Sequence, residues 1–154
     1  MQDILIQCND IPWTKVYEGV SIKELRSCAV TGQWVQLIKM EAGAALPKHF
    51  HLGAGEFIVI KGEFVYRGGT ARTGDYGYEP LGAYHDEPRA TEETVLFYIG
   101  YGALALLNPD GTLKGVMGAN VINEFASRAA ASGEAKASAD APSKAKREPA
   151  TAAG

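Results

Sequence analysis

Short stretches in which apolar and polar residues alternate run through most of this chain, and glycines separate them. Residues 33–40, 56–60, 63–66, 94–99, 103–107 and 113–116 each have the length and composition of a strand. Lys61-Gly62 predicts a hairpin between the second and third stretches, and Asn108-Pro109-Asp110-Gly111 predicts a turn between the last two. Only residues 21–26 and 121–131 favour helix. The pattern therefore predicts an all-β antiparallel sandwich or barrel.

The composition changes after Phe125. From Ser127 to Gly154 the chain has no aromatic residue and no Val, Leu, Ile or Met, and Ala, Ser, Lys, Glu and Pro predominate. Such a segment buries too little apolar surface to offset the entropy of ordering it. The sequence predicts one folded domain over residues 1–126 and a disordered tail over 127–154, with partner binding by the tail as an alternative.

The charge of the chain limits the kinds of molecule that it is expected to bind. The formal net charge is −3 and no basic stripe is visible, which argues against nucleic acid and anionic membrane surfaces. No apolar run approaches the roughly 20 residues of a spanning helix, so we expect a cytoplasmic protein. Cys8 and Cys28 are the only cysteines. They are too few for a disulfide framework and are expected to be reduced, partly buried thiols.

The three histidines fall into two short clusters. His49 and His51 follow Gly43 in the spacing Gly-x5-His-x-His, and His85 closes Gly74-x5-Pro80-x-Gly82-x2-His. Imidazole is the commonest protein ligand for a catalytic transition metal. A chain with all of its histidines in such a pattern is expected to hold a metal ion, although lone histidines on strands are more often only packed or solvated.

These clusters, with Gly62 between them, resemble the paired motifs of the cupin superfamily. The resemblance implies a small single-domain jelly-roll barrel, also called a double-stranded β-helix, with a metal inside. It implies His49, His51 and His85 as ligands. It does not fix the chemistry, because cupins include oxygenases, isomerases and storage proteins.

One ligand of the usual cupin motif is missing. Counting back from Gly62 through the six-residue spacer lands on Gly55, where the family has a glutamate, and Glu56 stands one residue later. A shift of one residue turns a strand side chain to the opposite face. We therefore expect Gly55 to face the metal and Glu56 to point away, which leaves a three-histidine site. The alternative is a bulge that returns Glu56 to the ion. Arg89 stands where the motif usually ends in Asn.

Three neutral imidazoles would leave a divalent ion its full charge and open positions for a bidentate substrate and O2. A mono-anionic chelate such as an enolate suits that site. Zn(II) would bind as well, but oxygenase chemistry requires Fe(II) or a similar redox-active metal.

A closer resemblance extends from residue 33 to about residue 125. The segments His49–Gly62, Val65–Gly69 and Gly77–His85 look like those of the acetylacetone-cleaving, or β-diketone, dioxygenases, and the dihydroxyacetophenone dioxygenases share the general pattern. Both families imply a non-haem Fe(II) enzyme that splits a carbon–carbon bond with O2. The implied substrate is a β-diketone bound as its enolate, or a similar hydroxyketone, and the products are a carboxylate and an α-dicarbonyl.

Further residues follow from this resemblance with less support. Glu79 lies six residues before His85 and could orient a histidine, and Arg67 matches an arginine that the β-diketone dioxygenases keep near the site. The two could form a compensated buried pair, or only a surface ion pair. Phe57 has the strand parity of Gly55 and is expected to line the pocket, where the family tends to have tyrosine. Phe97 and Tyr101 are further candidates for the pocket wall, although aromatic residues on strands are more often plain core.

Three functions remain open at the level of sequence. They are a β-diketone dioxygenase, a related oxygenase for an aromatic hydroxyketone, and a zinc- or ligand-binding cupin sensor without turnover. The resemblance also favours a homo-oligomer.

Overall fold

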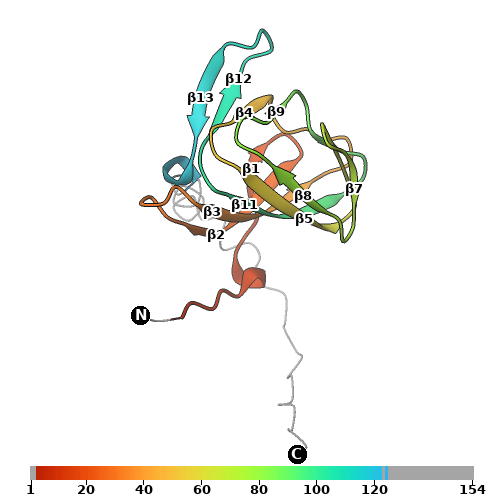
Figure 1. The fold of residues 1–154 in the computed structure, drawn as a ribbon. Coiled ribbons are helices and arrows are strands. Elements are labelled where there is room, and N and C mark those ends of the chain that lie inside the picture. Colours follow the sequence, from red (N-terminus) through yellow and green to blue (C-terminus); the bar gives the residue numbers. More distant parts are fainter. Residues whose placement is uncertain (1–2, 123, 125–154) are drawn as a thin grey trace, which may run out of the picture.

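The computed structural model describes residues 3–122 and 124 as an antiparallel β barrel (Figure 1). The larger sheet has the strand order β1 (Thr14–Tyr17), β2 (Val20–Ser27), β3 (Trp34–Met40), β11 (Thr94–Gly100), β5 (Gly55–Lys61), β8 (Tyr76–Glu79). The second has the order β13 (Leu113–Met117), β12 (Leu104–Leu107), β4 (His49–His51), β9 (Tyr84–His85). The third has the order β10 (Arg89–Ala90), β6 (Glu63–Tyr66), β7 (Gly69–Arg72). The predicted all-β antiparallel barrel is confirmed.

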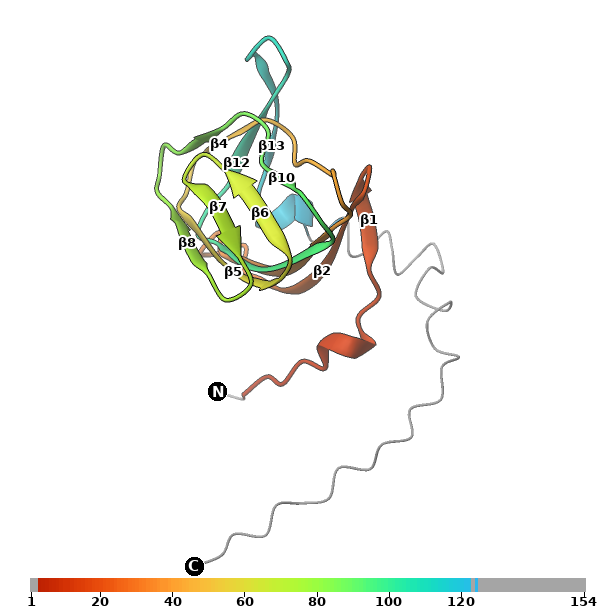
Figure 2. The same ribbon diagram turned by 90° about the vertical axis from the view of Figure 1, so that its right-hand side faces the viewer.

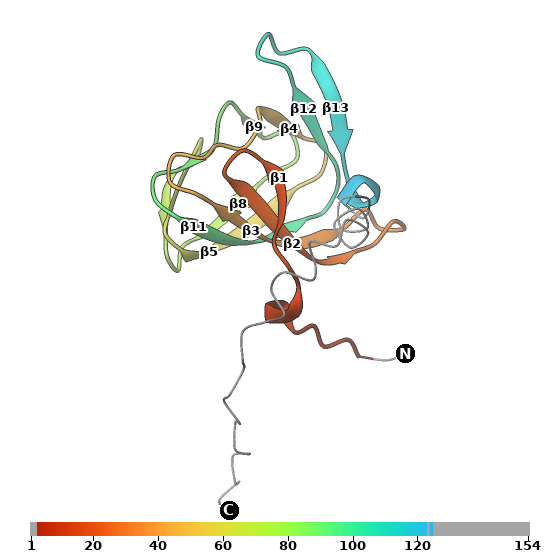
Figure 3. The same cartoon turned by 180° about the vertical axis from the view of Figure 1, so that it is seen from behind.

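The two smaller sheets lie across the barrel from the larger one. Figure 2 views the barrel with β6 and β7 in front, and Figure 3, the view from behind Figure 1, has β1 and β2 in front. The β12–β13 hairpin extends beyond the barrel, and the 3-10 helix η1 (Cys8–Asp10) lies on the N-terminal segment outside it (Figures 1 and 3). The two histidine clusters are thus carried by short strands, β4 and β9, opposite the large sheet.

Aromatic rings fill the barrel interior at positions where a neighbouring strand has glycine. A Cβ atom on Gly100 would lie 2.2 Å from the Trp34 ring, and one on Gly55 would lie 2.0 Å from the Tyr98 hydroxyl. Trp34 and Tyr98 stack with ring centroids 5.0 Å apart, and the Trp34 indole donates a hydrogen bond to the Gly102 carbonyl. The glycines make this packing possible because they leave the inner face of the sheet open for large rings.

Most predicted strands are confirmed, including the pairing of β12 with β13 across the Asn108–Gly111 turn. The predicted helix over residues 21–26 is wrong, since this segment forms β2 and pairs with β3 over its length. Val20 and Ile22 are buried at strand spacing, and burying them in the sheet outweighs a six-residue stretch's weak preference for helix.

The predicted hairpin at Lys61-Gly62 is also wrong. Strand β5 pairs with β11 and β8, whereas β6 pairs with β7 and β10. The chain therefore passes from one sheet to another at Gly62, whose φ of +86° suits glycine. The tight hairpin lies further on, where Tyr66 pairs with Gly69.

The remaining predictions concern the C-terminal segment, the cysteines and membrane spans. Residues 119–122 and 124 are helical, and the rest of the predicted 121–131 helix, like the tail over 127–154, lies outside the described residues. The boundary at residue 126 stays a prediction. Cys8 and Cys28 are free and half-buried. In the part of the chain that the structure describes, no helix has the length and apolar character to cross a membrane.

Candidate metal centre

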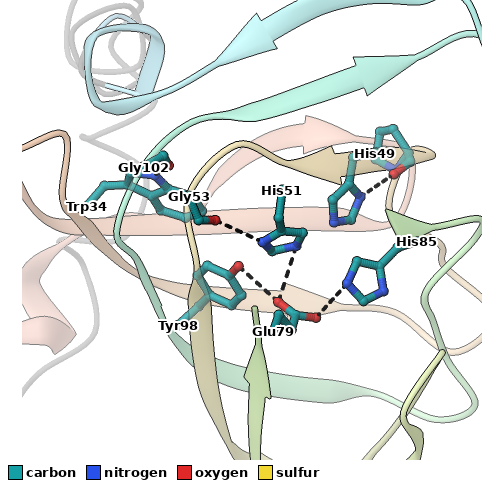
Figure 4. Close-up of polar contacts among 9 residues, drawn as sticks. Trp34, His49, His51, Gly53, Glu79, His85, Tyr98 and Gly102 are labelled. Atoms are coloured by element: carbon teal, nitrogen blue, oxygen red, sulfur yellow. Dashed lines mark hydrogen bonds and ion pairs between the residues drawn. The ribbon is translucent and has the colours of Figure 1, made fainter. Parts of the chain in front are cut away.

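Strands β4 and β9 bring the three histidines together inside the barrel (Figure 4). His49 pairs directly with His85 across the two strands, and His51 lies two residues along β4, so all three rings project from the same face. One ligand atom from each lies within 4.8 Å of the others, and the side chains are 0–7% exposed. Among the described residues, this is the group of His, Cys, Asp or Glu side chains that could hold a metal ion.

Backbone carbonyls fix the orientation of two imidazoles. Nδ1 of His49 lies 2.7 Å from the Pro47 carbonyl, and Nδ1 of His51 lies 3.3 Å from the Gly53 carbonyl. A carbonyl can only accept, so each Nδ1 carries the proton and each Nε2 keeps a free lone pair. The buried Nε2 atoms of His51 and His85 make no hydrogen bond. Buried nitrogens without a hydrogen-bond partner fit a metal ion, which would use those lone pairs.

Burial also sets the charge of these rings. Desolvation lowers the pKa of His51 and of His85 to about 4, and it lowers the pKa of His49. The histidines are therefore neutral near pH 7, which is the form that binds a metal. The three together supply nitrogen ligands without any charge of their own.

A carboxyl group lies beside the histidines. Glu79 is 5% exposed, and its two oxygens lie 3.5 Å from His51 Nε2 and 3.2 Å from His85 Nε2 (Figure 4). The hydroxyl of Tyr98 donates a hydrogen bond to it at 3.0 Å. Burial raises the pKa of Glu79 to about 7. Because the neighbouring histidines are neutral near that pH, these contacts are not ion pairs of the metal-free protein.

Glu79 reaches this position from strand β8, directly opposite Gly55 on β5. The expected parity of Gly55 is correct, since it is buried and faces His51 and Tyr98. The absent side chain at Gly55 leaves space that the Tyr98 hydroxyl occupies. A carboxyl group thus lies close to the histidines, but it comes from β8 and not from position 55 on β5, where the usual motif has its glutamate.

Glu56 lies on the outer face of the barrel, where the hydroxyls of Tyr76 and Tyr101 donate hydrogen bonds to its carboxylate. The register between β5 and β8 is unbroken from Gly55 to Ile58, and the irregularity in β5 pairing lies at its other end, near Lys61. The alternative in which a bulge returns Glu56 to the ion is therefore wrong.

The predicted pair of Arg67 with Glu79 is not formed. Arg67 is exposed, and among the described residues Glu79 is joined to Tyr98 and the histidines. Arg67 and His85 instead line one open cleft between β6 and β9, of about 460 Å³. The guanidinium charge there contributes to lowering the pKa of His85. A long side chain at a strand end keeps its charge in water at little cost, whereas burial beside the histidines would be expensive.

The aromatic residues that were predicted to line the pocket do not all face the barrel interior. Phe57 is 1% exposed and faces inward, as its parity predicts, packed edge-on against Phe64 and Tyr66. It is not among the residues that line the cavity or the cleft, so its predicted place in the pocket wall is not found. The predictions that Phe97 and Tyr101 line the pocket are wrong. Phe97 lies on the outer face of β11, and Tyr101 is 43% exposed and bonded to Glu56.

Tyr98 was the functional candidate that the sequence did not reveal. Thr94, Leu96, Tyr98 and Gly100 are the inward residues of β11. The sequence Leu96-Phe97-Tyr98-Ile99 is apolar on both faces, so alternation could not assign the inner one. Only the pairing of Gly100 with Gly55 settles which aromatic residue faces the histidines.

The hydroxyls of Tyr98 and Tyr101 provide a matched test of these two faces. Removing the inner one in Tyr98→Phe leaves the buried Glu79 carboxyl without its donor, which is expected to cost about 1–3 kcal/mol of unfolding free energy. Tyr101→Phe is expected to leave the stability close to wild type, because its partner Glu56 remains in contact with water. Urea unfolding of the metal-free variants measures both, and equal losses would contradict the assignment of the faces.

An apolar cavity of about 70 Å³ adjoins the histidines. Its walls come from β1, β2, β3, β11 and β12, and His49, Glu79 and Tyr98 form part of its lining. The remaining wall includes Val20, Ile22, Ile38, Leu96, Leu104 and Ile122. Such a cavity accepts the apolar part of a small molecule.

The model of the ChrR cupin-like domain family matches residues 1–105 of the chain, a span that contains both histidine clusters. The chain belongs to this family. As a cupin, it is 28% identical over 111 residues to the acetylacetone-cleaving enzyme of Acinetobacter johnsonii, a match that covers 67% of the chain and 72% of that enzyme.

Solved structures resemble this cupin over most of its length. A candidate acetylacetone dioxygenase from Methylibium petroleiphilum PM1 superimposes with a TM-score of 0.76 and 26% identity, over 80% of this cupin and 94% of that chain. The acetylacetone dioxygenase of Acinetobacter johnsonii has a TM-score of 0.75 and 24% identity, over 83% and 92% of the two chains. The predicted relationship to the acetylacetone-cleaving dioxygenases is confirmed.

Proposed function

We propose that this cupin is a non-haem Fe(II) dioxygenase that cleaves a carbon–carbon bond of a β-diketone with O2. The observation that carries the proposal is the group of three buried, neutral imidazoles beside an apolar cavity, in a chain related to an acetylacetone-cleaving enzyme. His49, His51 and His85 would hold the iron. When bound, the iron supplies electron exchange with O2 and the Lewis acidity that stabilises an enolate.

The charge of the site favours this substrate class. Neutral ligands leave the ion its full 2+ charge, and an enolate that chelates through two oxygens would cancel half of it in a cavity with little access to water. The substrate's alkyl groups would contact the apolar walls. We propose that Phe57 contributes indirectly, because it packs against Tyr66, whose ring lies 6.2 Å from that of His85.

Glu79 would act through its charge. Its oxygens face the Nε2 atoms of His51 and His85, which are the nitrogens that would bind the ion, and the Tyr98 hydroxyl holds the carboxyl group there. A nearby 2+ charge favours the ionised carboxylate, which would then offset part of the charge of the ion. Arg67 lies in the cleft that reaches His85, where its charge would attract an anionic substrate or retain an anionic product.

The variant Glu79→Gln tests this role. We expect it to weaken Fe(II) binding about 10- to 100-fold, the usual effect of losing a group just outside the metal ligands, because it removes a negative charge beside the ion. The matched control is Glu56→Gln, which removes the same charge from the outer face of the barrel. Anaerobic competition with a chromophoric chelator measures both affinities, and unchanged affinity in Glu79→Gln would contradict the proposed role.

The function itself is tested by reconstitution. The protein is loaded anaerobically with Fe(II), mixed with a panel of 1,3-diketones and hydroxyacetophenones, and then exposed to O2. We expect a chelate absorbance band with a 1,3-diketone, followed by O2 uptake and release of a carboxylate and an α-dicarbonyl. Turnover of hydroxyacetophenones alone would assign the related oxygenase activity. Retention of zinc with no O2 uptake on any compound would support a binding protein or sensor instead. The cytoplasmic location and the homo-oligomer stay predictions.

A further inference from the structure

Gln36 is a polar residue in the apolar wall of the cavity. It lies on the inner face of β3 between Trp34 and Ile38, and it is 4% exposed. Its side chain is part of the cavity lining. A buried amide normally has partners, because leaving its donor and acceptor unpaired is unfavourable.

The surroundings of Gln36 restrict what that partner can be. Among the described residues that line the cavity there is no lysine or arginine, and the ionisable ones are Glu79, His49, the half-buried Tyr17 and the buried Tyr98. A carboxylate or phosphate on the ligand would therefore meet no cation and would approach the carboxyl group of Glu79. A neutral hydroxyl or carbonyl group, in contrast, would bond with the amide, which offers both a donor and an acceptor.

Gln36 is also connected to the histidine site. It pairs across the sheet with Tyr98, whose hydroxyl binds Glu79 beside His51 and His85. Gln36 and His49 line the same cavity from opposite sheets. A molecule held at the histidines would extend between the apolar walls toward the amide of Gln36.

We propose that Gln36 determines substrate specificity by selecting neutral β-dicarbonyl compounds that carry a hydroxyl or carbonyl group beyond the chelating pair. This inference rests on the proposed function and deepens it. An unsubstituted short diketone would leave the amide of Gln36 unpaired. A substrate with a polar group at the far end of a short apolar chain would satisfy it, and a charged group at that position would be rejected.

The test compares ligand binding in wild type and in Gln36→Leu, which keeps a similar volume but removes the amide. The ligands are linear 2,4-diones of increasing chain length, each with and without a terminal hydroxyl. Binding is measured on the zinc-loaded protein, since zinc holds a chelate but does not exchange electrons with O2. Fluorescence of Trp34, which lines the cavity, reports binding when Trp13 is replaced in a Trp13→Phe background.

We expect wild type to bind at least one hydroxylated dione about tenfold more tightly than its plain counterpart, which is the effect of one buried hydrogen bond. Gln36→Leu should lose this preference while binding the plain diones as well as wild type or better. The control Gln33→Leu makes the same change on a glutamine that is bonded to Arg26 away from the cavity, and it should keep the preference.

Three results would overturn the inference: no preference in wild type, the same preference in Gln36→Leu, or equal weakening of both ligand series in that variant. Equal weakening would assign Gln36 a purely structural role. The inference and the proposed function fail separately. A hydroxyl preference on zinc without O2 uptake on iron would overturn only the dioxygenase activity, whereas O2 uptake without the preference would overturn only the role of Gln36. If no dione binds to wild type, both fall.

Discussion

The variant His85→Ala is expected to retain no Fe(II) above background after anaerobic reconstitution and desalting, while remaining folded. The three histidines are the only ones in the chain. Their ligand atoms form one group, and in the proposed site the carboxyl group of Glu79 lies beside the ion without binding it. Removing one of three nitrogen ligands leaves two, which is too few to hold a divalent ion against water and buffer. Iron content per chain, measured by atomic emission, checks the prediction.

Two controls separate loss of the ligand from loss of the fold. The first control is Tyr84→Phe, next to His85 on β9. The Tyr84 side chain is half-buried and lies on the face of β9 opposite His85, so this variant should keep full iron content. The circular dichroism and unfolding midpoint of metal-free His85→Ala should remain close to those of metal-free wild type. Full iron occupancy in His85→Ala would mean that the ion is held elsewhere.

The substitution Gly55→Ala is expected to destabilise the protein by about 1–3 kcal/mol, the usual cost of overfilling a packed core. The added Cβ would lie 2.0 Å from the Tyr98 hydroxyl and 3.3 Å from the His51 ring. Tyr98 would have to move, and its hydrogen bond to Glu79 would be strained or lost. Urea unfolding of the metal-free protein measures the change.

Gly115→Ala is the matched control, because a Cβ at Gly115 would meet no described atom within 4 Å. The unfolding free energy of this variant should stay within about 0.5 kcal/mol of wild type. A glutamate at position 55, as in the common cupin motif, would be still less tolerated than alanine, since Tyr98 and Glu79 already fill that region. If Gly55→Ala were as stable as wild type, the packing of Tyr98 over Gly55 would be incorrect.

The fold and the three histidines could be predicted because their signals are local. Each strand is marked by its own alternation and bounding glycines, and His49, His51 and His85 stand at fixed distances from those glycines. The face of Gly55 could be predicted as well, because the spacer to Gly62 fixes its parity along a single strand. Each of these inferences needed only residues that are near one another in the sequence.

The polar residues around the histidines depend on pairing between distant strands. Glu79 contacts the histidines because β8 pairs with β5, and Tyr98 contacts Glu79 because β11 pairs with β5 on its other edge. The register of those pairs is set by the whole barrel. For the same reason Phe97 and Tyr101 were assigned to the wrong face, and Gln36 could not be recognised as part of the cavity wall.

The central claim is that an iron ion is held by three imidazoles while the nearby carboxyl group of Glu79 stays off it. The most direct test is the anomalous difference map of a crystal of the Fe(II)-loaded protein. The account predicts one strong peak at coordination distance from His49, His51 and His85, with Glu79 beside the histidines but not bound to the ion. A peak with a carboxylate oxygen of Glu79 among its ligands, or one away from these histidines, would contradict it.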